Sequence, residues 1–213
     1  MSKELRRRAQ AGFTLIEVLV VLILVALLAA AVFPVVTQHV REGDPVRVAR
    51  DLGAIKTGVE AFNLNVRPAF PGDLEDLAHR VSTNASTDVQ VTGAVYNSGH
   101  NSRWDGPYID ASLSETGLAS GNAIATGYGA FIQNDLVCIG TGAATATCAT
   151  GTFVAAKVTG LDGSQFTAVN NLIDGSVVAS PTSQTEGKMR CALNGVNGMC
   201  EPAFYLIAPF RSN

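Results

Sequence analysis

One acidic residue inside an apolar run is the first feature of this sequence that could do chemistry. Glu17 lies near the start of the segment AGFTLIEVLVVLILVALLAAAVFPVV, which has no polar side chain from Val18 to Val36. A carboxylate in apolar surroundings tends either to become neutral or to pair with a cation. We therefore expect Glu17 to pair with an ammonium group. The alternative is a carboxylate at lipid headgroup level, beside a helix N-terminus whose dipole stabilises an acid.

The four cysteines are the second group with evident chemistry. Cys138 and Cys148 are close in sequence, and so are Cys191 and Cys200. In an exported domain an even number of cysteines indicates disulfides, and three pairings are possible. Local pairing is favoured because each pair flanks a loop of small or polar residues, and each bond would contribute about 2–3 kcal/mol. A metal site is the alternative, but the spacing is not Cys-x-x-Cys and the three histidines are scattered.

Motifs of catalysis are not found in the sequence. It has no nucleophile elbow, no HExxH and no phosphate-binding Gly-Lys-Ser/Thr loop. Its acidic residues are dispersed, and we therefore expect no enzymatic activity. The formal net charge is −3, and loss of residues 1–12, which hold four bases and one acid, would leave −6. This charge argues against a general affinity for nucleic acid.

The element that must position Glu17 is a long N-terminal helix. Residues 18–36 would form a helix of about 28 Å, close to the hydrocarbon thickness of a bilayer. The four bases of residues 1–10 favour an N-terminus on the cytoplasmic side and export of the rest. A secretory signal would be cut after its apolar region, whereas the small residue Gly12 comes before it. Cleavage after Gly12 would leave the helix in place, with a free amine at Phe13.

The helical pattern continues beyond the apolar run, over residues 37–66. One apolar face recurs at helical spacing, and we expect it to pack on the chain's own domain; its members are Val48, Leu52, Ile55, Val59, Phe62 and Val66. Pro34 and the Gly43-Asp44-Pro45 cluster predict a kink or a locally extended stretch near each proline. Whether Pro45 produces a second break stays open.

The remainder of the chain, residues 67–213, has the pattern of a β-rich domain. After a connecting region with a short helix from Leu74, residues 82–102 predict an exposed loop with one strand. Further segments bounded by Gly, Asn, Ser or Pro predict an antiparallel sheet, with strands at 129–139, 152–158, 176–178 and 203–207 and a helix at 164–173. The fold class is α+β: a long N-terminal α-helix packed on a small antiparallel β-sheet.

The N-terminal residues Gly12-Phe13-Thr14-Leu15-Ile16-Glu17, followed by the apolar run, resemble the class III signal of type IV pilins and type II secretion pseudopilins. The resemblance implies that a prepilin peptidase cuts between Gly12 and Phe13 and that the new terminus is N-methylated. It also implies that Glu17 meets the terminal amine of a neighbouring subunit during assembly. Replacing Glu17 is then expected to leave processing intact and to impair incorporation into a filament.

A second resemblance lies in the connecting region. Trp104-Asp105-Gly106-Pro107-Tyr108 looks like the Trp-x-Gly-Pro-Tyr segment of major pseudopilins. We expect Trp104 and Tyr108 to be structural anchors that hold this loop on the long helix, because large aromatic residues in loops usually bury area. Some major pseudopilins bind calcium in a late loop, and Asp162, Asn170 and Asp174 are weak candidate ligands here. Asx residues beside glycine more often form turns, so no cofactor is otherwise expected.

The resemblance implies four regions: a leader at 1–12, a transmembrane and polymerisation helix at 13–36, an amphipathic helix half at 37–66, and an exported domain at 67–213. The expected function is a structural subunit of a type IV pilus or pseudopilus, in the inner membrane before assembly and then in a periplasmic or bacterial surface filament. Expected partners are further copies of the chain, prepilin peptidase, the membrane and an inner-membrane assembly platform. The alternative is a monomeric, membrane-anchored periplasmic binding module.

Overall fold

The computed structural model describes residues 13–84, 88–109, 123–140, 145–148, 153–175, 187–193 and 199–210, with the backbone alone at 33–42, 145, 192–193 and 199. The chain divides into two compact units, residues 1–41 and residues 42–213. Each unit is considered by itself below. The boundary between them falls inside the first helix, so it separates the apolar part of that helix from the part that belongs to the globular unit.

Helix α1 runs without interruption from Leu15 to Asn65. A locally extended stretch near Pro34 or Pro45 is therefore wrong, since the backbone is helical at both prolines. The other expected outcome, a kink within the helix, stays a prediction. A proline costs a helix one N–H donor and crowds the preceding turn, but the hydrogen bonds on either side can keep the helix continuous. The predicted end of the helix at residue 66 agrees with the observed end to within one residue.

In the part of the chain that the structure describes, the sheet has seven strands, all paired antiparallel, in the order β1-β2-β4-β7-β5, with β3 beside β2 and β6 beside β7. The strands are β1 (Ala123–Ala125), β2 (Phe131–Ile139), β3 (Thr145–Ala146), β4 (Phe153–Thr159), β5 (Leu161–Asp162), β6 (Met189–Leu193) and β7 (Met199–Pro209). Strands β2, β4 and β7 confirm three of the predicted strands, and the predicted strand at 176–178 lies outside the described residues.

The described residues of the globular unit also form four short helical segments: α2 (Glu75–Ala78), α3 (Ser98–Arg103), the 3-10 turn η1 (Gly127–Gly129) and α5 (Gly163–Asp174). Helices α2 and α5 confirm their predictions. The prediction for 82–102 is partly wrong, because Val89 and Val95 form only an isolated bridge and residues 98–103 form α3. The reason is local: the Asn97 side chain and the His100 ring cap α3 reciprocally, a capping box without the usual Ser/Thr and Glu.

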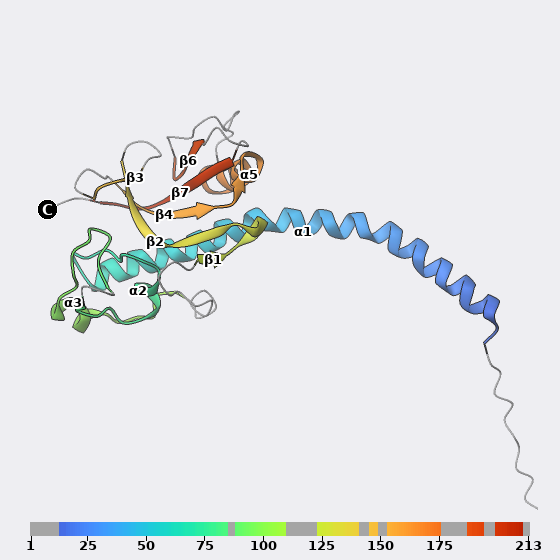
Figure 1. Cartoon of the computed structure of the whole chain (residues 1–213), viewed down its shortest axis with the longest axis horizontal. Helices are drawn as coiled ribbons and strands as arrows, with labels where there is room; N and C mark the ends of the chain where they lie inside the picture. Colours follow the sequence, from blue (N-terminus) through green and yellow to red (C-terminus); the bar gives the residue numbers. More distant parts are fainter. Residues whose placement is uncertain are drawn as a thin grey trace, which may run out of the picture. The chain divides into compact units, whose positions relative to one another are not determined.

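The core of the globular unit lies between the second half of α1 and the sheet. All six members of the predicted apolar face of α1 are fully buried, which confirms that prediction. They share one hydrophobic cluster with sheet residues such as Ile132, Val154, Ala156 and Val158. Figure 1 shows β2, β4 and β7 running beside this part of α1, which is the arrangement predicted for an α+β fold.

Candidate functional site

The N-terminal segment begins its helix with a side-chain cap. The Glu17 N–H donates to the Thr14 hydroxyl at 3.3 Å and to the Thr14 carbonyl at 3.1 Å, and the Val18 N–H also donates to that carbonyl. Thr14 and Glu17 therefore have the spacing of a capping box, and the Glu17 carboxylate lies in the first turn of α1. The helix dipole favours an acid there. Gly12 lies outside the described residues.

The apolar side chains of this segment are exposed on every face of the helix. Phe13 is 83% exposed, Leu22 is 63% exposed and Val32 is 56% exposed. Residues Leu15–Val32 have a mean hydropathy of 3.1, and none of this stretch is buried within the chain. By length and composition it could cross a membrane, although a signal sequence would pass the same test. Such a surface requires lipid or protein to cover it.

Glu17 lies within this exposed apolar surface. Among the described residues, the ion pairs are those of Arg47 and Arg50 with Asp51 and of Lys56 with Glu60, all in the globular unit. The described part of the chain thus gives the Glu17 carboxylate no cationic partner. A cation that pairs with it must come from beyond these residues.

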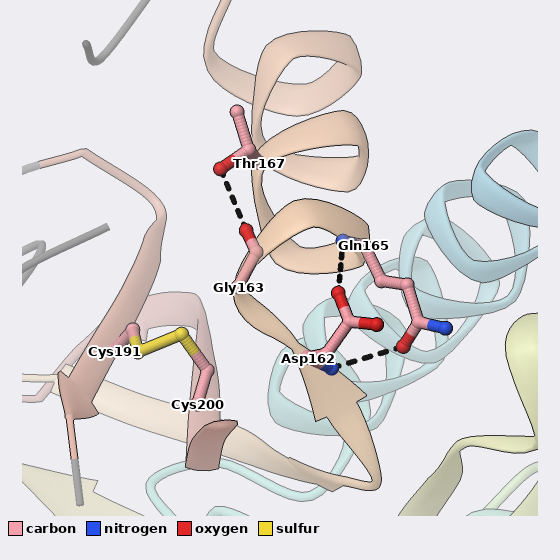
Figure 2. The surroundings of a disulfide bond; sticks show 6 residues. All are labelled: Asp162, Gly163, Gln165, Thr167, Cys191 and Cys200. Atoms are coloured by element: carbon pink, nitrogen blue, oxygen red, sulfur yellow. Dashed lines mark hydrogen bonds between the residues drawn. A yellow bond between two sulfur atoms is a disulfide. The ribbon is translucent and has the colours of Figure 1, made fainter. Parts of the chain in front are cut away.

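Both disulfides join neighbouring segments of the sheet. Cys138 at the end of β2 bonds to Cys148, just after β3, with 5.1 Å between the Cα atoms. Cys191 of β6 bonds to Cys200 of β7, with 5.4 Å between the Cα atoms, and both residues are fully buried (Figure 2). These are the local pairs that the sequence favours. The first bond closes the connection between β2 and β3, and the second closes the connection between β6 and β7. The described residues include no free cysteine.

The three weak calcium candidates are not brought together. Asp162 caps α5 by accepting from the Gln165 N–H at 2.8 Å (Figure 2), whereas Asp174 lies at the other end of α5 and accepts from the N–H groups of Lys188 and Met189. A helix of this length separates its ends by about 18 Å. Asn170 is buried between them. The three therefore cannot ligate one ion at the 2.3–2.6 Å that calcium requires, and the described residues hold no cluster of three or more His, Cys, Asp and Glu suited to a metal.

The aromatic residues of the connecting loop are anchors, as predicted. Trp104 is 8% exposed, and its indole N–H donates to the Asp76 carbonyl at 2.8 Å. Tyr108 packs edge-on against Trp104 and against Phe62 of α1, with ring centroids 5.4 and 5.7 Å apart. Its hydroxyl accepts from the Asn65 side chain at 3.2 Å. These contacts hold the loop on the last two turns of α1.

A buried acidic network in the same loop is a feature that the sequence did not predict. The Asp76 carboxylate accepts from the Tyr96 hydroxyl at 2.7 Å and from the Gly72 N–H at 2.8 Å. Burial, reinforced by neighbouring Asp73, raises the pKa of Asp76 to about 7. Burial likewise raises the pKa of Asp73 to about 6. Nothing in the sequence indicates that Asp76 contacts a tyrosine twenty residues later, because no helical or strand periodicity connects the two positions. The network could therefore not be predicted.

Comparison with known proteins places a family signature on the N-terminal segment. Residues 7–33 match the family model described as the prokaryotic N-terminal methylation motif. The type II secretion system core protein G of Klebsiella michiganensis is 31% identical over 61 residues, a match that covers 29% of this chain and 43% of that relative. The chain thus aligns with less than half the length of this relative. No solved structure matches the chain.

Proposed function

We propose that this chain, whose residues 7–33 match the prokaryotic N-terminal methylation motif, is a structural subunit of the type IV pilin and pseudopilin kind that polymerises into a filament. Processing between Gly12 and Phe13 yields the mature subunit, and its helix at residues 13–36 packs among copies of itself in the filament core. The subunit waits in the inner membrane and passes from there, through an assembly platform, into a periplasmic or surface filament.

The observation that carries this proposal is an apolar helix that its own chain leaves uncovered and that holds a single acid. Lipid covers such a surface while the subunit waits, and neighbouring helices cover it after assembly. Glu17 then pairs with the ammonium group at Phe13 of the next subunit. A buried carboxylate without its cation is strongly unfavourable, so this pair selects one register and one direction of assembly.

Two features favour a secretion-type pseudopilus as the filament. The relative that the chain matches is named as a core protein of type II secretion, and the Trp104–Tyr108 segment resembles that of major pseudopilins. The total length and the second cysteine pair are more typical of a surface pilin. In either filament the role of this chain is structural, and its partners are copies of itself, the peptidase and the assembly machinery.

A monomeric, membrane-anchored binding module is the competing function, favoured by the separation of the chain into an apolar unit and a compact unit of residues 42–213. Such an anchor needs neither Glu17 nor cleavage before Phe13. It predicts a chain that stays in the membrane fraction and is insensitive to replacement of Glu17.

The test combines N-terminal sequencing of the native protein with electron microscopy of sheared and periplasmic fractions. We expect a mature chain that begins at Phe13. We also expect Glu17→Val to be processed normally while filament yield falls at least about tenfold, the effect of losing about 1.4 kcal/mol. Asp105→Asn, at an exposed site of the globular unit, serves as the control. Normal filaments from Glu17→Val, or a native chain that still begins at Met1, would contradict the proposal.

A further inference from the structure

The segment of residues 95–103, which contains α3, is held on the globular unit by little buried surface. Of its nine residues, Tyr96 and His100 are buried, whereas the other seven are half-buried or exposed. On either side of it, Val91 and Trp104 pack on the hydrophobic core, and Figure 1 shows α3 at the edge of the unit. We call residues 95–103 the α3 segment. A segment with few buried contacts opens locally at a lower free energy than the sheet does.

Tyr96 anchors the α3 segment to the rest of the unit. Its ring packs edge-on against Phe62 of α1 and against His100, with ring centroids 6.2 and 5.9 Å apart. Its hydroxyl donates to the Asp76 carboxylate at 2.7 Å and lies 3.4 Å from the Phe70 carbonyl oxygen. The hydrogen bond to Asp76 is buried, so it joins the α3 segment to α2 inside the unit.

Two further side-chain hydrogen bonds join the α3 segment to neighbouring residues nearer the surface. The Asn101 side chain donates to the Val81 carbonyl, and the Gln90 side chain donates to the Val95 carbonyl at 3.5 Å. Helix α3 has six residues, and a helix this short is not stable in water without tertiary contacts. The docking of Tyr96 therefore decides whether the segment keeps its structure.

The Asp76 carboxylate that accepts from Tyr96 is buried among uncharged donors. Asp76 is 3% exposed, and its other hydrogen bond comes from the Gly72 N–H at 2.8 Å. The charged groups that act on it are Asp73 and Asp88, which are both acids. Burial, reinforced by Asp73, raises the pKa of Asp76 to about 7. An ionised carboxylate in these surroundings is unfavourable, whereas the protonated acid is not.

Cations are absent from the described surroundings of this carboxylate. Asp73 is itself influenced by further acids, namely Glu75, Asp88 and Asp135. The arginines of this region have other neighbours: the Arg80 guanidinium lies 5.8 Å from the centre of the Trp104 ring, and the Arg103 charge acts on His100. Residues 85–87 and 110–122, which the structure does not describe, contain no Lys, Arg or His. An ionised Asp76 must therefore be stabilised by water.

We propose that the α3 segment is a pH-sensitive flap, which opens when Asp76 releases its proton to water and closes when Asp76 regains it. In the closed form Tyr96 covers the carboxyl group, and opening lets water reach it. The carboxyl group has its ordinary pKa of 3.8 when open and a pKa of about 7 when closed. The opening equilibrium therefore rises with pH between these two values and levels off above the second. This inference goes beyond the proposed function, because it requires the globular unit alone and no filament.

His100 is the titratable group of the α3 segment that faces Tyr96, and it acts in the opposite direction. Its Nδ1 accepts from the Asn97 N–H at 3.2 Å, so protonation of the ring would remove this bond and loosen α3. Burial and the Arg103 charge lower the pKa of His100. Its effect is thus confined to pH values below 6.5, and it cancels when two chains that both retain His100 are compared.

Unfolding of the whole unit is the alternative route by which water could reach Asp76. Global unfolding would expose the α3 segment and the sheet together, with equal protection of their main-chain amides against hydrogen exchange. A local opening exposes little surface, so its equilibrium hardly responds to urea, whereas global unfolding does. The rate of amide exchange in dilute urea therefore separates the two routes.

The first experiment measures amide hydrogen exchange of the native full-length chain in detergent by mass spectrometry, from pH 5 to pH 8. Rates are corrected for the intrinsic pH dependence of exchange. At each pH we expect peptides of residues 95–103 to exchange at least about tenfold faster than peptides of β4 and β7, with no acceleration in dilute urea. Equal protection of the α3 segment and the strands, or equal acceleration by urea, would overturn the proposal.

The second experiment compares the native chain with Asp76→Asn, which keeps an acceptor for Tyr96 but cannot ionise. Relative to Asp76→Asn, the opening equilibrium of the native α3 segment should rise about fiftyfold between pH 5 and pH 7 and about twofold or less from pH 7 to pH 8. Asp105→Asn, which changes an exposed aspartate two residues beyond the segment, should behave like the native chain. The same pH dependence in Asp76→Asn would refute the role of Asp76. If Asp76→Asn does not fold, the native series decides, since protection of residues 95–103 that does not fall between pH 6.5 and pH 7 would also refute it.

Discussion

Asp76 is the residue of the connecting loop through which pH should affect the stability of the folded chain most strongly. Asp76 is 3% exposed, and its carboxylate lies between the Tyr96 hydroxyl and the Gly72 N–H. The charged groups that act on its pKa are two further acids, Asp73 and Asp88, and both raise it. Hydrogen bonds to the carboxylate oppose this effect but are outweighed by burial. The folded chain thus holds a proton at Asp76 that the unfolded chain releases.

The first prediction concerns the pH dependence of stability. The pKa of Asp76 is about 7 in the folded chain against an ordinary value of 3.8, so between these values only the unfolded chain is ionised at this position. The free energy of unfolding should therefore fall as the pH rises through this range and level off above it, by on the order of a few kcal/mol. Asp76→Asn should flatten the slope. Chemical denaturation of the full chain in detergent at a series of pH values measures it.

The control for this prediction is Asp105→Asn, which changes an exposed aspartate of the same loop. His100 acts in the opposite direction. Burial and the charge of Arg103 lower the pKa of His100, so its contribution to stability is lost as the pH falls below 6.5. That effect is common to the native chain and to both variants, so it cancels in the difference. If the free energy of unfolding falls equally steeply with pH in Asp76→Asn and in the native chain, then Asp76 is not the group responsible.

At the residue scale, the sequence allows a prediction where a residue has a regular spacing or stands among residues of a different type. The burial of Trp104 follows from a large aromatic side chain in a loop, and the structure confirms it. The pairing role of Glu17 stays a prediction, because no ion pair of Glu17 is found among the described residues and its proposed partner belongs to another copy. Asp76 could not be identified, since Asp73 and Asp76 look like ordinary acids at a helix start. The burial of Asp76 depends on Tyr96 and Trp104, which the fold brings in from distant positions.

At the scale of elements, α1 performs two tasks with one continuous helix. Its first half is apolar all round and its second half is apolar on one face, and each half matches a different environment. Periodicity made both halves predictable. The short strands β1, β3 and β5 were not predicted, because two or three residues carry too little pattern to stand apart from turns. Helix α3 was missed for the same reason.

Two glycines of α1 provide the second prediction. A Cβ at Gly58 would lie 2.8 Å from Ile109 Cγ2 and 3.0 Å from the Tyr108 carbonyl oxygen, whereas a Cβ at Gly53 would meet nothing within 4 Å. We expect Gly53→Ala to raise the free energy of unfolding by about 0.5–1 kcal/mol, because alanine is the better helix former. Gly58→Ala should lower it by about 1–3 kcal/mol through overpacking.

Each alanine variant controls for the other, since both changes are made in one helix and have the same effect on the unfolded chain. Denaturant titration followed by the fluorescence of Trp104 reports on the loop that Gly58 contacts. Stabilisation by both changes would show that the Tyr108–Ile109 segment moves aside at little cost. The close packing of this segment on α1 would then be refuted.

At the scale of the whole molecule, the two units differ in where their apolar surface is buried. The globular unit buries its apolar residues within itself, and the hydrophobic cluster draws its described members from residues 48–210. The N-terminal unit leaves its apolar surface exposed. From the sequence we expect the helix to change character after residue 36, where the unbroken apolar run ends, and an exported domain from residue 67; these bounds stay predictions. The two compact units meet between residues 41 and 42, and the second half of the helix is counted with the globular unit.

The last prediction follows from this division. A fragment of residues 43–213, expressed in an oxidising compartment so that both disulfides form, should be soluble without detergent, because it retains the whole described core and lacks the exposed apolar helix. Light scattering after gel filtration should give a monomer, and thermal unfolding should be a single cooperative transition. The full chain without detergent should form large aggregates under the same conditions. A fragment that aggregates or unfolds without cooperativity would mean that residues 13–42 are needed to complete the fold. The N-terminal helix would then be part of the domain's own architecture rather than a surface kept for lipid and for other copies.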